Sequence, residues 1–299
     1  MEATESKTAF IAIIGCPNVG KSSLLNRFLG EKVAIVSPKP QTTRTRILGV
    51  RTEGNVQLVF TDTPGYHTPK NKLGEKMVKA VGAGIHDVDA CLLVTEAKGE
   101  VRDAEKVLID KIRKENIPAV LAINKIDTLE NKDALLARIA AYSALYDFTA
   151  AVPVSAKDGS GLDALLRELN ALAFPSVHLF PDDALTDQPE KVIAAEYIRE
   201  KILRYVEKEI PHGTAVSIEL FREREQTGIL DIEATIYCEK ESHKGILIGK
   251  NGDMLKRIST GARLDMERFF GCKVNLRCWV KVKEDWRNRE ALIRNFGLD

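Results

Sequence analysis

An eight-residue stretch near the start of the chain has the residue types and the spacing to hold a polyphosphate. Residues 15–22 are Gly-Cys-Pro-Asn-Val-Gly-Lys-Ser. The two glycines let the backbone turn so that successive N–H groups point into one concavity. Lys21 would neutralise the β- and γ-phosphates, and the hydroxyl of Ser22 would be a hard oxygen ligand for Mg²⁺. The stretch therefore predicts a nucleoside triphosphate bound with its metal ion.

The elements on either side of this loop are those that a phosphate loop requires. The apolar run 10–14 predicts a strand, and residues 23–29 predict a helix whose positive N-terminal end faces the anion. The pattern fits ATP and GTP equally. The residues predicted to bind the nucleotide here are Gly15, Cys16, Pro17, Asn18, Val19, Gly20, Lys21, Ser22 and Ser23.

Two later stretches predict the rest of the metal and γ-phosphate site. Thr43 lies in a polar loop and would bind Mg²⁺ only when a γ-phosphate is present, with Thr42 as the alternative ligand. Asp62 ends an extended segment, where its carboxylate can hold a Mg²⁺-bound water, and Gly65 can offer its N–H to the γ-phosphate. We therefore predict Ser22 and Thr43 as metal ligands. The predicted catalytic residues are Lys21, Ser22, Thr43, Asp62 and Gly65, and the turn adds Thr63 and Pro64 to the nucleotide contacts.

The stretch Asn-Lys-Ile-Asp at 124–127 follows an apolar strand and distinguishes GTP from ATP. The carboxylate of Asp127 can accept paired bonds from guanine N1 and N2, whereas adenine would leave it desolvated and unpaired. Lys125 would stack along the base, and Asn124 would tie this loop to the phosphate loop. After the next short strand, the backbone N–H of Ala156 would donate to guanine O6. The predicted nucleotide contacts in that stretch are Ser155, Ala156 and Lys157.

The five motifs occur in order, each after an expected strand, and this order predicts the fold class. The apolar runs 90–95 and 119–123 are typical of parallel strands buried on both faces. Open α/β sheets bind ligands at the C-terminal ends of their strands. We expect an α/β fold, a Ras-like P-loop NTPase with a mostly parallel sheet and helices on both faces, over residues 1–174. Residues 175–190 contain three prolines and break the periodicity, so we predict a linker there and a second domain at 191–299.

The length and composition of the chain agree with two domains. The net charge of the 299 residues is +1, yet residues 240–299 hold fourteen Lys and Arg against eight Asp and Glu. This imbalance favours a polyanion-binding surface in the second domain. No apolar run approaches the roughly 18–20 residues of a membrane span, and the first residues lack a signal-peptide pattern. We therefore expect a soluble, cytoplasmic protein.

The second domain is predicted as a helix (191–209), two strands (214–220 and 230–237), two helices and a third strand (272–282), with a last helix at 284–295. This order is similar to the α+β KH fold of bacterial type, type II. Gly-Lys-Asn-Gly at 249–252 would bring the backbone close to single-stranded nucleic acid, beside an apolar groove with Ile248 and Ile258. We expect Trp279 to pack in the interior, with base stacking as the alternative. The predicted RNA-binding residues are Ile248, Gly249, Lys250, Asn251, Gly252, Lys256 and Arg257.

The phosphate loop, the Asp-Thr-Pro-Gly turn at 62–65 and the C-terminal Gly-x-x-Gly together resemble the Era family of GTPases over nearly the whole chain. The resemblance implies GTP and GDP with Mg²⁺ as ligands, and K⁺ held with the help of Asn18. Tyr66 stands where many GTPases have a Gln that orients the attacking water, so slow intrinsic turnover is expected. The family also implies binding near the 3′ end of 16S ribosomal RNA, a role in maturation of the small (30S) ribosomal subunit, and peripheral contact with the inner face of the cell membrane. We expect a monomer.

Two other functions fit part of the pattern. An RNA-binding scaffold with a structural guanine nucleotide would hold GDP that never exchanges. A P-loop kinase would need an acceptor site and an Arg-rich lid, and the Asn-Lys-x-Asp stretch argues against it. Comparing GTP with ATP binding, and RNA affinity in each nucleotide state, separates the three.

Overall fold

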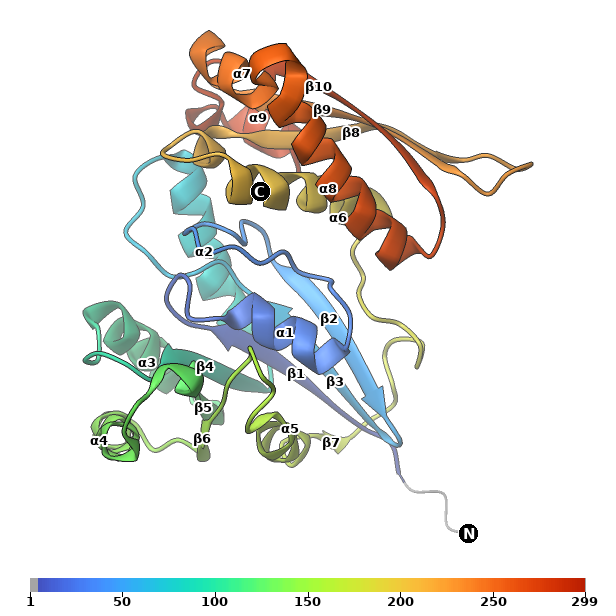
Figure 1. Ribbon diagram of the computed structural model, residues 1–299. Helices are drawn as coiled ribbons and strands as arrows, with labels where there is room; N and C mark the ends of the chain where they lie inside the picture. Colours follow the sequence, from blue (N-terminus) through green and yellow to red (C-terminus); the bar gives the residue numbers. More distant parts are fainter. Residues whose placement is uncertain (1–4, 299) are drawn as a thin grey trace. The chain divides into compact units, whose positions relative to one another are not determined.

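A mostly parallel sheet carries the predicted nucleotide motifs in the computed structural model, which describes residues 5–298 (Figure 1). Its strand order is β2-β3-β1-β4-β5-β6, and only β2 is antiparallel to its neighbour along this order. A short strand β7 (Phe174–Pro175) pairs antiparallel with the start of β1. The strands are β1 (Lys7–Ile14), β2 (Ile47–Glu53), β3 (Val56–Asp62), β4 (Ala90–Glu96), β5 (Ala119–Asn124) and β6 (Ala150–Pro153).

Helices cover both faces of this sheet, as predicted. The helices α2 (Lys72–His86), α3 (Asp103–Glu115) and α4 (Lys132–Ser143) share one buried apolar cluster with alternate residues of β1, β4 and β5. The helices α1 (Lys21–Leu29) and α5 (Leu162–Asn170) contact strands as well, and Phe28 of α1 stacks on Phe60 of β3 with ring centroids 4.9 Å apart. In the parallel register, Phe60 lies beside Ile11 of β1. Ile11 alternates along β1 with the residues that belong to the apolar cluster, so it points to the other face of the sheet. The helix α1 therefore lies on the face opposite to α2, α3 and α4.

The chain divides into two compact units whose bounds differ from the predicted domains. The first unit runs up to Ala34 and includes Thr43–Pro69 and Lys76–Asp187; the second includes Ile35–Thr42, Lys70–Glu75 and the residues from Gln188. The expected linker 175–190 is therefore mostly part of the first unit. The side-chain amide of Gln57 on β3 explains this, because its Oε1 accepts from the backbone N–H groups of Leu179 (2.8 Å) and Phe180 (3.0 Å). The prolines interrupt periodicity without freeing the segment from the sheet.

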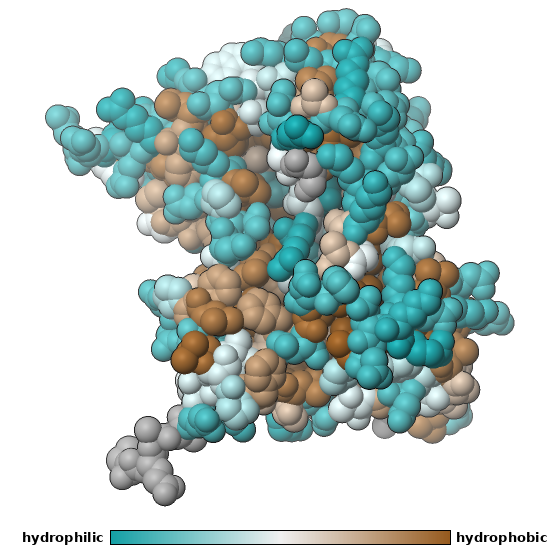
Figure 2. All heavy atoms as spheres, turned by 180° about the vertical axis from the view of Figure 1, so that it is seen from behind, coloured by the Kyte–Doolittle hydropathy of each residue, from teal (hydrophilic) through white to brown (hydrophobic). Residues whose placement is uncertain are grey.

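The second unit has the predicted helix-strand-strand-helix-helix-strand order. Its sheet has the order β10-β9-β8, with β9 antiparallel to β8 and parallel to β10. One shared core joins three of the helices, all except the last one, to one face of this sheet. Figure 2 shows hydrophilic residues at the tip of the β8–β9 hairpin. The elements are α6 (Glu190–Tyr205), β8 (Ala215–Glu223), β9 (Leu230–Cys238), α7 (Glu241–Ile248), α8 (Asp253–Phe270), β10 (Val274–Val282) and α9 (Glu290–Asn295).

The C-terminal end of the second unit differs from the prediction. The expected helix 284–295 is a 3₁₀ turn, Trp286–Asn288, followed by the short α9. Trp286 is fully buried, and its indole N–H donates to the carbonyl of Gly213 at 2.9 Å. Trp279, which we expected in the interior, is 44% exposed. It occupies an exposed position of the alternating strand β10, so that expectation is wrong.

Among the helices of residues 5–298, none combines the length and the apolar character needed to cross a membrane.

Candidate nucleotide site and nucleic-acid interface

The phosphate loop lies between the end of β1 and the start of α1, as the motif requires. Gly20 has a φ of 101°, and a Cβ placed on it would lie 2.2 Å from Nδ2 of Asn124. Only glycine fits that conformation and that approach. Lys21 is 6% exposed, and its ammonium donates to the carbonyls of Gly15 (3.2 Å) and Cys16 (3.1 Å). Burial lowers the pKa of Lys21, and the nearby Asp62 carboxylate opposes that shift.

Three residues from three separate segments meet where the metal is predicted. Oγ of Ser22 donates to Oδ2 of Asp62 at 2.6 Å. Oγ1 of Thr43 lies 2.9 Å from Oγ of Ser22 and 3.3 Å from the same carboxylate oxygen. The hydroxyl of Thr42 instead donates to the carbonyl of Lys39 at 2.7 Å. The structure therefore brings Thr43, and not Thr42, to the other predicted metal-site residues.

The donor set at this place fits a Mg²⁺ ion. Asp62 has no exposed surface, and within the described part of the chain its Oδ1 has no hydrogen-bond partner. Burial raises the pKa of Asp62, while the charge of Lys21 and the two hydroxyl hydrogen bonds act in the opposite direction. A bound divalent cation with its waters would give this buried carboxylate a partner, and hydroxyl and carboxylate oxygens are the ligands that Mg²⁺ prefers.

The predicted base-binding stretches also come together. Nδ2 of Asn124 donates to the carbonyl of Val19 at 2.8 Å, which ties this loop to the phosphate loop as expected. Oγ of Ser155 donates to Asp127 at 3.0 Å, and Nζ of Lys157 lies 3.6 Å from the same carboxylate. These contacts hold Asp127 at the end of the sheet where guanine would bind.

One predicted base contact has a different partner in the structure. The backbone N–H of Ala156, expected at guanine O6, donates to Oδ1 of Asn124 at 3.0 Å. A bond from Ala156 to O6 would have to replace or share this one, because the N–H carries a single proton.

Sequence reasoning missed two residues that shape this site. Arg27 of α1 donates to the carbonyls of Ala156 (2.8 Å) and Lys157 (2.5 Å). Glu96, at the end of β4, forms an ion pair with Lys125. Burial alone would raise the pKa of Glu96, but its hydrogen bonds and ion pairs outweigh burial and lower it. Only the strand-end position of Glu96 was visible as a signal in the sequence.

The aromatic residue after Gly65 does not resemble a water-positioning group. The backbone N–H of Tyr66 donates to the carbonyl of Gly15 at 3.2 Å, so the turn 62–65 closes on the phosphate loop. The Tyr66 ring packs against the α2–α3–α4 cluster, with Nζ of Lys111 5.0 Å from its centroid. Thr63 is held by its hydroxyl, which donates to the carbonyl of Ile13 at 3.0 Å.

The Gly-x-x-Gly turn joins α7 and α8 as predicted. Gly249 has a φ of 76°, and a Cβ on it would lie 2.8 Å from the backbone nitrogen of Met254. The side chains that follow it toward α8 are exposed, and the guanidinium of Arg257 lies 4.2 Å from the ring centroid of Tyr205. The exposed basic or polar residues here are Lys250, Asn251, Lys256 and Arg257.

The apolar groove beside this turn differs from the prediction. Ile258 is fully buried in the core and offers no surface to a base, so that assignment is wrong. It faces the sheet because α8 is amphipathic and turns this position inward. Ile248 is partly exposed, and Ile246, which sequence reasoning did not select, is 49% exposed.

Comparisons with known proteins match both units. The family model described as 50S ribosome-binding GTPase matches residues 10–125, and the KH domain model matches residues 209–287. GTPase Era of Clostridioides difficile is 48% identical over 98% of this chain and 99% of its own length. GTPase Era of Ruminiclostridium cellulolyticum is 48% identical over 97% of each chain.

Solved structures agree with this result. Era in complex with MgGDPNP and nucleotides 1506–1542 of 16S ribosomal RNA has a TM-score of 0.94 and 37% identity, covering 98% of this chain and 99% of its own. A tyrosine-to-alanine variant of Aquifex aeolicus Era bound to GDP and AlF₄⁻ has the same score, identity and coverage. Since a GTP site built on these motifs and a KH unit match known relatives along nearly the full chain, the protein belongs to the Era family of GTPases.

Proposed function

We propose that this protein hydrolyses GTP slowly at the site formed by the phosphate loop, Thr43 and Asp62, and that its KH unit binds 16S ribosomal RNA near the 3′ end during maturation of the small ribosomal subunit. The meeting of Ser22, Thr43 and Asp62 is the observation that carries the GTPase assignment. The RNA assignment is supported by the solved Era that contains nucleotides 1506–1542 of that RNA, and by the exposed Gly-x-x-Gly turn.

Each residue of the nucleotide site has a role in this proposal. Lys21 neutralises negative charge on the β- and γ-phosphates, and the backbone N–H of Gly65 stabilises the charge that develops on the γ-phosphate. Ser22 and Thr43 supply oxygens to Mg²⁺, and Asp62 holds one of its waters. When bound, the ion neutralises charge on the phosphate oxygens. The packed ring of Tyr66 leaves the attacking water without a side-chain amide to orient it, which is why turnover is slow.

The base is selected by Asp127. Its carboxylate accepts bonds from guanine N1 and N2 and rejects adenine, while Lys125 stacks along the base. Ser155 and Lys157 hold that carboxylate in place. One solved Era contains MgGDPNP and the other contains GDP with AlF₄⁻, and these ligands support the Mg²⁺ and guanine nucleotide of this proposal.

Five finer features belong to the same proposal. Asn18, which has a left-handed φ of 65°, helps to hold K⁺ near the phosphates. The protein is a cytoplasmic monomer, it contacts the small ribosomal subunit, and it associates peripherally with the inner face of the cell membrane. A GTPase rate that is equal in K⁺ and Na⁺ buffers would remove K⁺ from this proposal.

The function is tested by binding and crosslinking on the full chain. We expect GTP and GDP to bind and ATP not to bind, and we expect a 3′-terminal 16S RNA oligonucleotide to bind more tightly with a non-hydrolysable GTP analogue than with GDP. Crosslinking to total RNA should map to Lys250 and its neighbours. Bound GDP that never exchanges, with RNA affinity independent of the nucleotide, would instead support the RNA-binding scaffold.

A further inference from the structure

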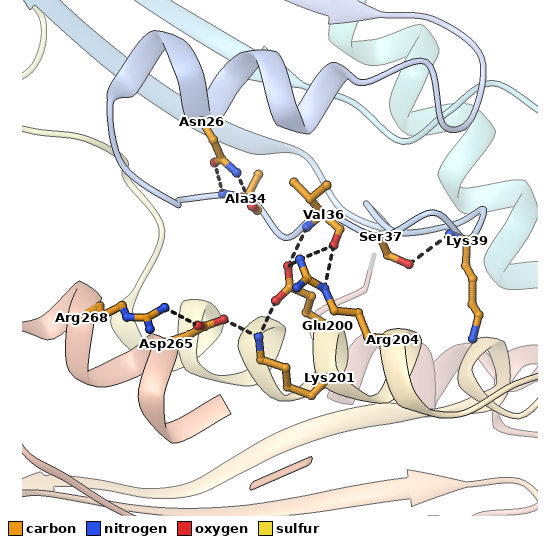
Figure 3. A network of polar contacts seen from close by, with 10 residues as sticks. All are labelled: Asn26, Ala34, Val36, Ser37, Lys39, Glu200, Lys201, Arg204, Asp265 and Arg268. Atoms are coloured by element: carbon orange, nitrogen blue, oxygen red, sulfur yellow. Dashed lines mark hydrogen bonds and ion pairs between the residues drawn. The ribbon is translucent and has the colours of Figure 1, made fainter. Parts of the chain in front are cut away.

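The helix α6 contains three consecutive charged residues that are almost completely buried. Arg199, Glu200 and Lys201 are 2%, 0% and 5% exposed. Burying a charge costs free energy unless the charge is paired and hydrogen-bonded. The partners of these charges therefore indicate the role of this part of α6. Several of the partners belong to the segment 35–42, which lies in the same compact unit as α6 (Figure 3).

Glu200 holds the start of that segment. Its Oε1 accepts a hydrogen bond from the backbone N–H of Val36 at 3.0 Å, and its Oε2 accepts from Lys201 at 3.0 Å. Lys201 also pairs with Asp265 of α8 at 2.5 Å. The guanidinium of Arg204 donates to the carbonyl of Val36 at 3.2 Å and to Oε1 of Glu200 at 3.1 Å. Both backbone groups of Val36 are thus bound by α6 (Figure 3).

Arg199 holds the other end of the segment. Its guanidinium donates to the carbonyl of Thr42, and also to that of Gln41 at 3.4 Å. Glu196, one turn earlier on α6, accepts from the same guanidinium at 2.7 and 2.5 Å and so fixes its orientation. The carbonyl of Thr42 belongs to the peptide group whose nitrogen is that of Thr43. A rigid, planar peptide group therefore links the Arg199 contact to the backbone of Thr43.

We propose that Arg199 is a positioning residue for the metal ligand Thr43. With this contact made, the hydroxyl of Thr43 lies 2.9 Å from the hydroxyl of Ser22, the other residue that would hold Mg²⁺. Without it, the preceding peptide group is free to rotate, and Thr43 must be ordered when the nucleotide binds. The proposal rests on the proposed GTPase function and names the residue of the RNA-binding unit through which the nucleotide state acts.

The proposal has a reciprocal consequence. If the contact between Arg199 and the Thr42 carbonyl favours the metal-ligating position of Thr43, then binding of GTP with Mg²⁺ must favour that contact to the same extent, because coupling free energies are symmetric. Arg199 would therefore influence two measurements, the Mg²⁺ requirement of GTP hydrolysis and the difference in RNA affinity between the GTP-analogue and GDP states. Substituting a residue that only stabilises α6 would change neither the Mg²⁺ requirement nor this difference in RNA affinity without also changing GDP affinity.

The test compares full-length wild type with Arg199→Ala, Arg199→Lys and the control Lys191→Ala, an exposed charge on the same helix. For Arg199→Ala we expect the Mg²⁺ concentration for half-maximal GTP hydrolysis to rise about tenfold, as for other residues that orient metal ligands. GDP affinity should not change, because in the proposed function Thr43 binds the metal only when a γ-phosphate is present. Arg199→Lys should recover part of the loss, and Lys191→Ala should behave as wild type.

RNA binding completes the test. In Arg199→Ala, the RNA affinity ratio between the GTP-analogue and GDP states should move toward one, with the GDP-state affinity unchanged. A wild-type Mg²⁺ dependence in Arg199→Ala would overturn the proposal, and so would an equal loss of GDP affinity, which would indicate general damage. If Arg199→Ala does not fold, the same measurements on Arg199→Lys and Glu196→Gln decide. Wild type without GTPase activity would contradict the proposed function instead.

Discussion

Oγ of Ser22 donates a 2.6 Å hydrogen bond to Oδ2 of Asp62, which joins the start of α1 to the end of β3. The two residues are forty positions apart in the chain, yet they are adjacent because β1 and β3 are parallel neighbours with Ile13 opposite Asp62. The parallel register thus brings the metal-site carboxylate beside the phosphate loop. A hydroxyl from Thr43 then makes this pair a three-residue oxygen cluster.

Substituting Thr43 and Thr42 one at a time tests which of the two threonines is the metal ligand. Thr43→Ala should raise the Mg²⁺ concentration needed for GTP hydrolysis about tenfold or more, because it removes an oxygen ligand. Thr42→Ala is the matched control, since its hydroxyl donates to the carbonyl of Lys39 and not to the metal-site residues. Hydrolysis followed by phosphate release over a Mg²⁺ series measures both. Equal effects of the two substitutions would show that the loop, and not one hydroxyl, supplies the metal site.

Replacing Asp127 tests the base assignment. Asp127→Asn should lower GDP affinity at least about a hundredfold, because the amide offers a donor to the N–H groups of guanine, and it should favour xanthine nucleotides, whose O2 accepts that donor. Titration with fluorescent GDP and XDP measures the change. Asp163→Asn, an exposed position on α5, is the control. Unchanged GDP preference in Asp127→Asn would exclude this carboxylate as the selector.

Replacing Lys250 tests the RNA interface. The exposed ammonium would contact phosphate, so Lys250→Ala should weaken binding of the 16S 3′ oligonucleotide several-fold and reduce the slope of log affinity against log salt by about 1. Lys283→Ala removes an equal charge from an exposed position after β10 and is the control. Affinities are measured by fluorescence anisotropy between 50 and 200 mM salt. If Lys283→Ala had the larger effect, the interface would lie on the sheet and not at the Gly-x-x-Gly turn.

The features that could be predicted are those with short-range signals. The phosphate loop combines strand, glycines and helix within about twenty residues, and the KH order follows from the periodicity of each element, so both were predictable. Arg27 was not, because it acts on the carbonyl of Ala156, 129 positions away. The segment 35–42 was assigned to the first domain for the same reason. Its sequence contains no sign that Glu200 and Arg199 bind its backbone.

The exposure of Trp279 and the burial of Ile258 were mispredicted for a related reason. Residue type indicates how apolar a side chain is, whereas the face it occupies depends on which side of the sheet the helices cover. The helices α6, α7 and α8 share a core with one face of the β8–β9–β10 sheet, and Trp279 is at an exposed position of β10. An apolar residue in a strand therefore does not by itself predict burial.

The last prediction concerns the pH dependence of the second unit. Arg224 donates two hydrogen bonds, of 2.6 and 2.7 Å, to the carboxylate of Asp231, and Asn275 donates a third at 2.7 Å. These contacts lower the pKa of Asp231 to about 2, and the hydrogen bonds from Arg224 are the largest cause. An unfolded chain would protonate this group near its ordinary pKa of 3.8. The folded state therefore gains stability from Asp231 above about pH 4, and loses it as the pH falls toward 2.

Asp231→Asn should accordingly lower the urea midpoint of the second unit at pH 7. The difference in urea midpoint between wild type and this variant should become smaller as the pH falls from 4 to 2. Both tryptophans of the chain, Trp279 and Trp286, lie in this unit, so their fluorescence follows its unfolding. Glu225→Gln at the hairpin tip controls for the loss of one negative charge. Only an ionised carboxylate gains stability from Arg224. A difference in urea midpoint that stays constant between pH 4 and pH 2 would therefore mean that Asp231 acts through its shape and not through its charge.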